Sequence, residues 1–230
     1  MAKKPTETEV ANTADTETTE TTALALSGGD PTGLAFDAND ITIPRLNVIQ
    51  KTSEIEGDLG SIMLDKMFEL APAGKELLVY VARADKAFKE NIPYDEDKVP
   101  QIVSNPDEVA ALAEESEYEI IEFADITLLI PAPEGREDDE EAFPLPIGDK
   151  QYALGKMTVQ KDSYRNTFKR LATFAAFHPK LSVQDRLWRF KSDEISRGKY
   201  TWFTPALAVS PDTASIDEDA VAFVKQLAAM

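Results

Sequence analysis

Apolar and polar residues alternate with the period of a β-strand in five segments of the chain. They span residues 76–83 (continuing toward Phe88), 118–132, 151–160, 186–195 and 199–209. Between the third and fourth segments the period changes to that of a helix over residues 162–177. Tyr164, Phe168, Leu171, Phe174 and Ala175 fall on one face there, with Asp162 or Ser163 as N-cap and His178-Pro179 as the end. A turn over residues 196–198 joins the last two strands.

This order of elements predicts a mainly β protein with flanking helices. Five strands with one helix between the third and fourth is the order of an OB-fold five-stranded barrel. A helix is expected within an insertion over about residues 100–117. A last amphipathic helix covers residues 217–228, with Ser215 as its N-cap.

The domain organisation follows from these elements and from composition. Residues 1–40 are rich in Thr and Glu and lack apolar periodicity, so we expect a disordered acidic tail. Residues 41–212 form the OB-like domain, in which residues 131–146 are an acidic loop. Residues 213–230 hold the C-terminal helix.

Charge is distributed very unevenly along the chain. The net charge is −18, which argues against a nucleic-acid partner. However, residues 150–203 hold twelve Lys or Arg against four Asp or Glu, and ten of the nineteen aromatic residues. Cations and aromatic rings concentrated together are typical of proteins that bind unpaired nucleic-acid strands, because bases stack on the rings.

The candidate nucleic-acid-binding residues are nine of the twelve cations and three of the rings in this stretch. They are Lys156, Lys161, Arg165, Lys169, Arg170, Arg186, Trp188, Arg189, Lys191, Lys199, Tyr200 and Trp202. The alternative is that the rings are core and the cations a solvated rim. Phe168, Phe174 and Phe177 are expected in the core. Trp188 is expected in the site, because it lies between Arg186 and Arg189 on one strand, whereas Trp202 is left open.

The sequence contains no motif that is typical of an enzyme, a cofactor site or a metal site. The chain has no Cys and a single histidine, His178, which is interpreted as a helix C-cap. Motifs for nucleotide binding, nucleophilic catalysis or zinc are absent, so we expect no enzyme activity, no cofactor and no metal. The acidic run in residues 137–141 is interpreted as a solvated loop. No apolar run approaches a membrane span, so we expect no membrane association.

The segments IPRLNVIQKTSEIEGDLGSI (residues 43–62) and YALGKMTVQKDSYRNTFKRLATF (residues 152–174) resemble phage-encoded proteins similar to OB-fold single-stranded DNA-binding proteins. The resemblance covers about residues 41–209. It implies sequence-independent binding of single-stranded DNA in phage replication or recombination, in the cytoplasm of a bacterial host. Phage or host replication and recombination proteins are the implied partners, and homo-oligomerisation is left open. Two alternatives remain, which are a phage structural or protein-interaction module and an acidic decoy that inhibits a DNA-binding enzyme.

Overall fold

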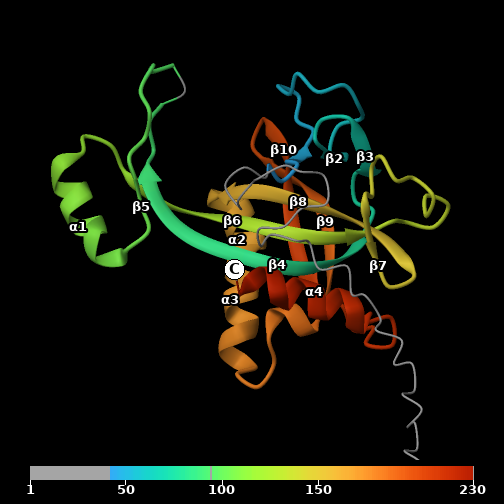
Figure 1. Ribbon diagram of the computed structural model, residues 1–230. Helices are drawn as coiled ribbons and strands as arrows, with labels where there is room; N and C mark the ends of the chain where they lie inside the picture. Colours follow the sequence, from blue (N-terminus) through green and yellow to red (C-terminus); the bar gives the residue numbers. More distant parts are fainter. Residues whose placement is uncertain (1–41, 94, 230) are drawn as a thin grey trace, which may run out of the picture.

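A large antiparallel sheet, strongly curved, forms the body of the protein (Figure 1). The computed structural model describes residues 42–93 and 95–229. The tail predicted to be disordered therefore lies outside the described residues. The strands of the sheet are β4 (Leu77–Glu90), β5 (Ile102–Val103), β6 (Ile120–Pro131), β7 (Leu145–Ile147), β8 (Lys150–Gln160), β9 (Leu187–Arg197) and β10 (Tyr200–Val209).

The strand order is β10-β9-β4-β6-β8-β7, with β5 beside β4. Strands β4, β6 and β8 pair in succession, and β9 then returns to lie beside β4, which is Greek-key topology. This confirms the mainly β prediction and the order of the five strands. No ladder joins β8 to β10 in the described residues, so the closed barrel stays a prediction.

A second, three-stranded sheet was not predicted. It contains β1 (Leu46–Val48), β2 (Ile62–Leu64) and β3 (Phe68–Ala71). The segment before β1 bonds to β8, where the Lys156 N–H donates to the Pro44 carbonyl at 2.8 Å. The segment after β1 bonds to β10 through the side chain of Gln50. The small sheet therefore spans the gap between β8 and β10, which no ladder joins in the described residues.

The predicted central helix is two helices, α2 (Lys161–Asn166) and α3 (Phe168–Phe177). The break is at Thr167, whose φ of −121° and ψ of −81° are not helical. The N-cap of α2 is Gln160, so the predicted cap at Asp162 or Ser163 is wrong, whereas His178 is the C-cap of α3 as expected. A 3-10 turn, η1 (Val183–Asp185), leads into β9.

The main core lies between the concave side of the large sheet, the small sheet and the two central helices. It contains Ile126, Leu128, Phe143, Trp188 and Phe190, and Phe168 and Phe174 pack against it as expected. The prediction for Phe177 is wrong, because its side chain is 76% exposed at the end of α3. The chain turns into the η1 segment there, so no element covers that ring.

The C-terminal helix α4 (Glu218–Ala228) covers the other side of the sheet, against Tyr80, Leu129 and Leu187. Its N-cap is Asp217 rather than the predicted Ser215. The Asp217 N–H donates to the Tyr80 hydroxyl at 2.7 Å, and the Tyr152 hydroxyl donates to the Asp217 carboxylate at 3.0 Å. This bonding to two buried tyrosines fixes where the helix begins.

The insertion between β4 and β6 leaves the body altogether. It holds β5 and the predicted helix, α1 (Pro106–Glu115), capped by Asn105. Strands β4 and β6 stay paired with each other beyond the reach of their outer neighbours β9 and β8. Figure 1 shows these two strands carrying α1 and β5 away from the rest of the molecule. No helix among the described residues is long and apolar enough to cross a membrane.

Candidate nucleic-acid interface

The hairpin formed by β9 and β10 carries six of the twelve predicted aromatic and basic residues. Gly198, with φ of +60°, makes the turn, so the turn lies one to two residues later than predicted. The register pairs Tyr200 with Arg197 and Trp202 with Ile195. Because side chains alternate along a strand, one face of the hairpin carries Arg189, Lys191, Arg197, Tyr200 and Trp202.

The opposite face carries Trp188, Phe190 and Leu207, which are all buried. Trp188 is 1% exposed, its Nε1–H donates to the Val183 carbonyl at 2.9 Å, and its ring packs edge-on against Phe174. The expectation that Trp188 lies in the site is therefore wrong. Arg189, the next residue of the strand, points to the opposite face, so its access to solvent does not require Trp188 to be exposed.

The two other candidate rings lie near the turn and reach the surface. Tyr200 is 65% exposed, and the Lys199 ammonium lies 5.2 Å from the centre of its ring. Trp202 is partly buried, and the Arg197 guanidinium lies over its ring at 5.7 Å. Each ring is thus accompanied by a cation.

Asp162 connects this hairpin to the start of α2. Its carboxylate lies 3.1 Å from Arg197 Nη2 and 3.5 Å from Arg165 Nη1. One carboxylate therefore holds two guanidinium groups at the edge of the hairpin. We define the hairpin site as Arg165, Arg197, Lys199, Tyr200 and Trp202. Lys161, exposed at the first position of α2, lies next to Asp162 in sequence.

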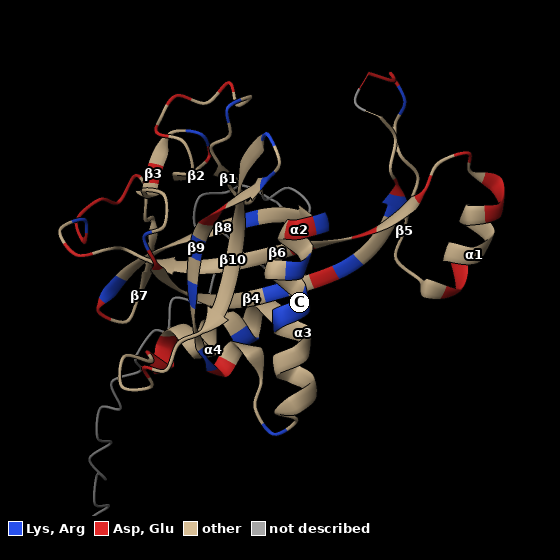
Figure 2. Cartoon of the chain, turned by 180° about the vertical axis from the view of Figure 1, so that it is seen from behind, with Lys and Arg blue, Asp and Glu red and all other residues tan. Residues whose placement is uncertain are grey.

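Basic residues gather over this region, as Figure 2 shows for the turn of the β9–β10 hairpin and for α2. The other predicted cations are not brought into the same cluster. Three form ion pairs, Lys156 with Asp125 at 2.8 Å, Arg189 with Glu76 at 3.5 Å, and Lys191 with Asp193 at 2.9 Å. These pairs reduce the charge that each cation offers to a phosphate.

The remaining predicted cations lie on or near α3. Lys169 lies 5.8 Å from the ring of Tyr164, and Arg170 donates to the Leu207 carbonyl at 3.0 Å. Arg186 follows η1 and precedes β9. The twelve predicted residues therefore do not form a single face, and only those near the hairpin turn and α2 come together.

Lys156 lines a polar hollow of about 480 Å³ between β8, β6 and the segment around β1. The other polar residues of its lining are Thr42, Arg45, Asn47, Asp125 and Thr158. Burial alone would raise the pKa of Asp125, but Lys156 and the Thr158 hydroxyl hold it below its ordinary value. The carboxylate therefore stays charged and competes with any anion for Lys156.

Sequence reasoning missed Arg197 and a second group of rings and cations. Arg197 was assigned to the turn, but it is the last residue of β9. The signal was Gly198, the residue in this segment that most readily adopts a positive φ, which favours a turn that begins there. On β4, the Lys86 ammonium lies 4.7 Å from the ring of Phe88 and 2.5 Å from Glu122. The sequence analysis expected this strand to continue toward Phe88, and alternation along the strand would have placed Lys86 and Phe88 on one face.

Among the described residues, no three His, Asp or Glu side chains are grouped so that they could hold a metal ion. No protein-family model, curated protein or solved structure matches this chain. The function is therefore argued from the geometry of the hairpin site.

Proposed function

We propose that the protein binds single-stranded DNA without sequence preference and without enzymatic activity, through the hairpin site. The observation that carries this proposal is the pairing of each surface ring with a cation, Tyr200 with Lys199 and Trp202 with Arg197. Unpaired bases can stack on such rings while the adjacent cations meet the phosphates. Base stacking does not depend on base identity, so the binding is expected to be sequence-tolerant.

The fold is consistent with this function. We infer that β4, β6, β8, β9 and β10 are the five strands of an OB-type barrel, with α2 and α3 between the third and the fourth. An OB-fold is a partly open Greek-key barrel that binds oligonucleotides. In this interpretation residues 44–50 occupy the opening between the third and fifth strands.

A role in phage replication or recombination, in the bacterial cytoplasm, is the setting that the sequence resemblance implies. In that setting the protein would cover and protect single-stranded DNA that replication proteins expose. Because the chain has a net charge of −18, most of its surface would repel phosphates, and contact with DNA would be limited to the cations around the hairpin.

Titration of fluorescent oligo-dT tests the proposal directly. At about 50 mM salt we expect measurable binding that weakens with salt, with a log–log slope of roughly −2 to −4 for a handful of phosphate contacts. Tyr200→Ala and Trp202→Ala should each weaken binding by about ten-fold, since a stacked base contributes about 1–3 kcal/mol. Phe177→Ala is the control, because this ring is also exposed, 76% against 65% for Tyr200, but lies at the C-terminal end of α3.

One observation favours a different class, a protein-interaction module that does not bind nucleic acid. Four of the predicted cations, Lys156, Arg165, Arg189 and Lys191, are ion-paired, and the large ring of Trp188 is buried. Absence of oligo-dT binding at about 50 mM salt, where phosphate contacts are strong, would reject DNA binding and leave this alternative.

A further inference from the structure

The insertion between β4 and β6 forms an arm that stands away from the body, and we define the arm as residues 91–119. Its charge is extreme, with nine Asp or Glu and a single lysine, Lys98. Figure 2 shows α1 and the adjoining loop with mostly acidic charges, on the opposite side of the view from the small sheet. The hairpin site has the opposite sign, so the molecule carries two complementary surfaces.

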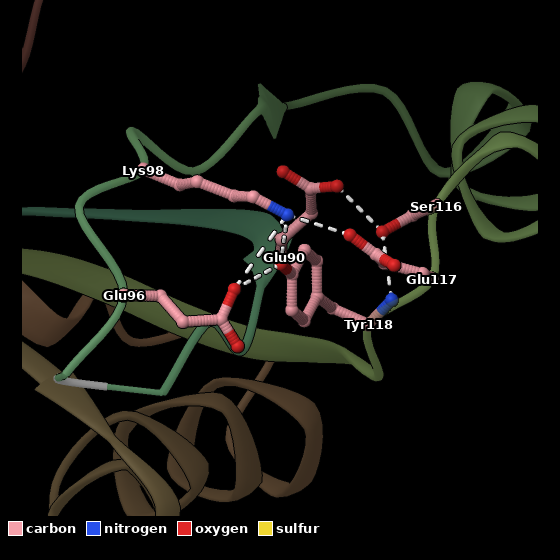
Figure 3. Close-up of polar contacts among 6 residues, drawn as sticks. All are labelled: Glu90, Glu96, Lys98, Ser116, Glu117 and Tyr118. Carbon is pink, nitrogen blue, oxygen red and sulfur yellow. Dashed lines mark hydrogen bonds and ion pairs between the residues drawn. The ribbon is translucent and has the colours of Figure 1, made fainter.

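The arm has a fixed shape. The β4–β6 ladder continues to its base, where Glu90 pairs with Ile120. The Glu90 carboxylate accepts the Gln101 N–H at 2.8 Å and the Ser116 hydroxyl at 2.5 Å, and these bonds lower its pKa. Lys98 lies 2.6 Å from Glu117 and also bonds to Tyr118, as drawn in Figure 3. These bonds and the β4–β6 ladder hold the arm in the position that Figure 2 shows, away from the hairpin turn of its own chain.

The arm also exposes apolar surface that nothing in the described chain covers. Val99 is 91% exposed and Ile102 is 58% exposed. Helix α1 buries only Leu112 against the arm, so the rest of its surface is unpartnered. A partner that covered these side chains would gain the free energy of removing their apolar surface from water. The exposed ring of Tyr200 supplies apolar surface in the hairpin site as well.

We propose that the arm of one copy docks on the hairpin site of a second copy. The acidic residues of the arm would face Arg165, Arg197 and Lys199, while Val99 and Ile102 would cover the rings. This contact joins two different surfaces, so it is heterologous and can continue from copy to copy. Self-association needs no nucleic acid. Its consequence, that the arm and DNA compete for one surface, rests on the proposed function.

The test compares two variants of the full chain by sedimentation velocity. Glu114→Lys/Glu115→Lys reverses charge in the last turn of α1, where the macrodipole favours cations, so the helix should persist. Glu140→Lys/Glu141→Lys makes the same charge change in the exposed acidic loop and is the control. We expect the wild type and the control to associate at about 50 mM salt and to dissociate at about 1 M, where the Debye length is about 3 Å. The arm variant should be monomeric in both.

Complementation then identifies the docking surface. Lys199→Glu/Tyr200→Ser removes a charge and a ring from the hairpin site and should also be monomeric. An equal mixture of this variant with the arm variant retains one intact arm and one intact hairpin site, so it should form dimers and stop there. A monomeric wild type at low salt, association that salt does not change, an arm variant that still associates, or a mixture that stays monomeric would each overturn the proposal.

The oligo-dT titration separates this proposal from the proposed function. If both hold, the arm variant binds oligo-dT more tightly than the charge-matched control at equal protein concentration. If the chains associate through the arm but no variant binds oligo-dT, self-association stands and the proposed function fails. If oligo-dT binds and the arm variant sediments like the wild type, the proposed function stands and arm docking is wrong.

Discussion

The side-chain amide of Gln50 pairs with both backbone polar groups of Phe203. Gln50 Nε2 donates to the Phe203 carbonyl at 2.8 Å, and the Phe203 N–H donates to Gln50 Oε1 at 2.9 Å. These are the two bonds that a neighbouring strand would have made with β10 at this position. The residues are 153 apart in the sequence, so one side chain ties the start of the described chain to its last strand.

Replacing Gln50 by Ala should therefore destabilise the fold. The substitution leaves the N–H and carbonyl of Phe203 without partners in a partly buried place, which costs about 1–3 kcal/mol. Denaturant unfolding measures the loss, and hydrogen exchange at the Phe203 amide should become faster. Lys51→Ala, at the exposed next residue, should change neither. Unchanged exchange at Phe203 in Gln50→Ala would show that the strand edge is protected in another way.

Gly60 should be intolerant of a side chain for a reason that also involves Phe203. It has φ of +82°, and a Cβ there would overlap the Phe203 ring and lie 2.8 Å from the Cβ of Ala73. Gly74 has a similar φ of +75° with nothing within 4 Å, so it separates backbone strain from steric overlap. We expect Gly74→Ala to cost about 1 kcal/mol and Gly60→Ala to cost about 1–3 kcal/mol more. Equal melting temperatures for the two variants would contradict this packing.

Periodicity was sufficient to predict the five long strands, because each contains a long run in which apolar and polar residues alternate. It was insufficient for β1–β3, which are only three or four residues long and pair with one another. Their place in the fold depends on the bonds that the segments on either side of β1 make to β8 and β10. The break at Thr167 was also hidden, since Tyr164 and Leu171 lie on one face whether or not the helix is continuous.

The candidate site was predicted less well than the fold. Alternation along β9 was expected to separate Trp188 from Arg189, and the register confirms it. Which of the two faces is covered depends on elements far away in the sequence, including Phe174 on α3. Local charge around Trp188 therefore carried no information about its burial. Lys199 and Tyr200 lie at the turn, where side chains reach solvent in almost any packing, so the sequence was enough to predict that they are accessible.

The attachment of α4 should weaken at low pH through Asp217. Burial alone would raise the pKa of this carboxyl, but the Ala220 N–H, the Tyr152 hydroxyl and Lys150 lower it below the ordinary value of 3.8. A carboxyl with a lower pKa in the folded state contributes stability above its unfolded pKa, and this is lost as the pH falls through the folded pKa. Stability should therefore decline as the pH falls below about 4, in the window of these two pKa values.

Asp217→Asn tests that linkage, because Asn is also a good N-cap but has no carboxyl to titrate. We expect a lower stability than the wild type at neutral pH and a shallower loss on acidification. Asp212→Asn is a control, since Asp212 has a lowered pKa but bonds only within its own loop to Ser215 and Ala214. Identical pH profiles for Asp217→Asn and the wild type would exclude Asp217 as the source.

Trp188 and Trp202 should differ in what their removal affects, since one ring is in the core and the other lies beside the turn. Trp188→Ala should lose about 3–5 kcal/mol of stability, as large buried rings do when truncated. At this chain length that lowers the melting temperature by roughly 6–20 °C. Trp188→Phe should lose less, because it keeps the contact with Phe174 and gives up only the bond to the Val183 carbonyl.

Trp202→Ala should show the opposite balance, with a smaller change in melting temperature and an affinity for oligo-dT about ten-fold weaker. The decisive comparison uses Trp188→Phe and Trp202→Phe, both of which retain a ring. If Trp202 stacks on a base, its Phe variant should keep most of the affinity, and Trp188→Phe should bind as the wild type does at temperatures where it is folded. A Trp188→Phe variant that folds but binds less tightly than Trp202→Ala would place the nucleic-acid contact on the buried face, which the packing against Phe174 excludes.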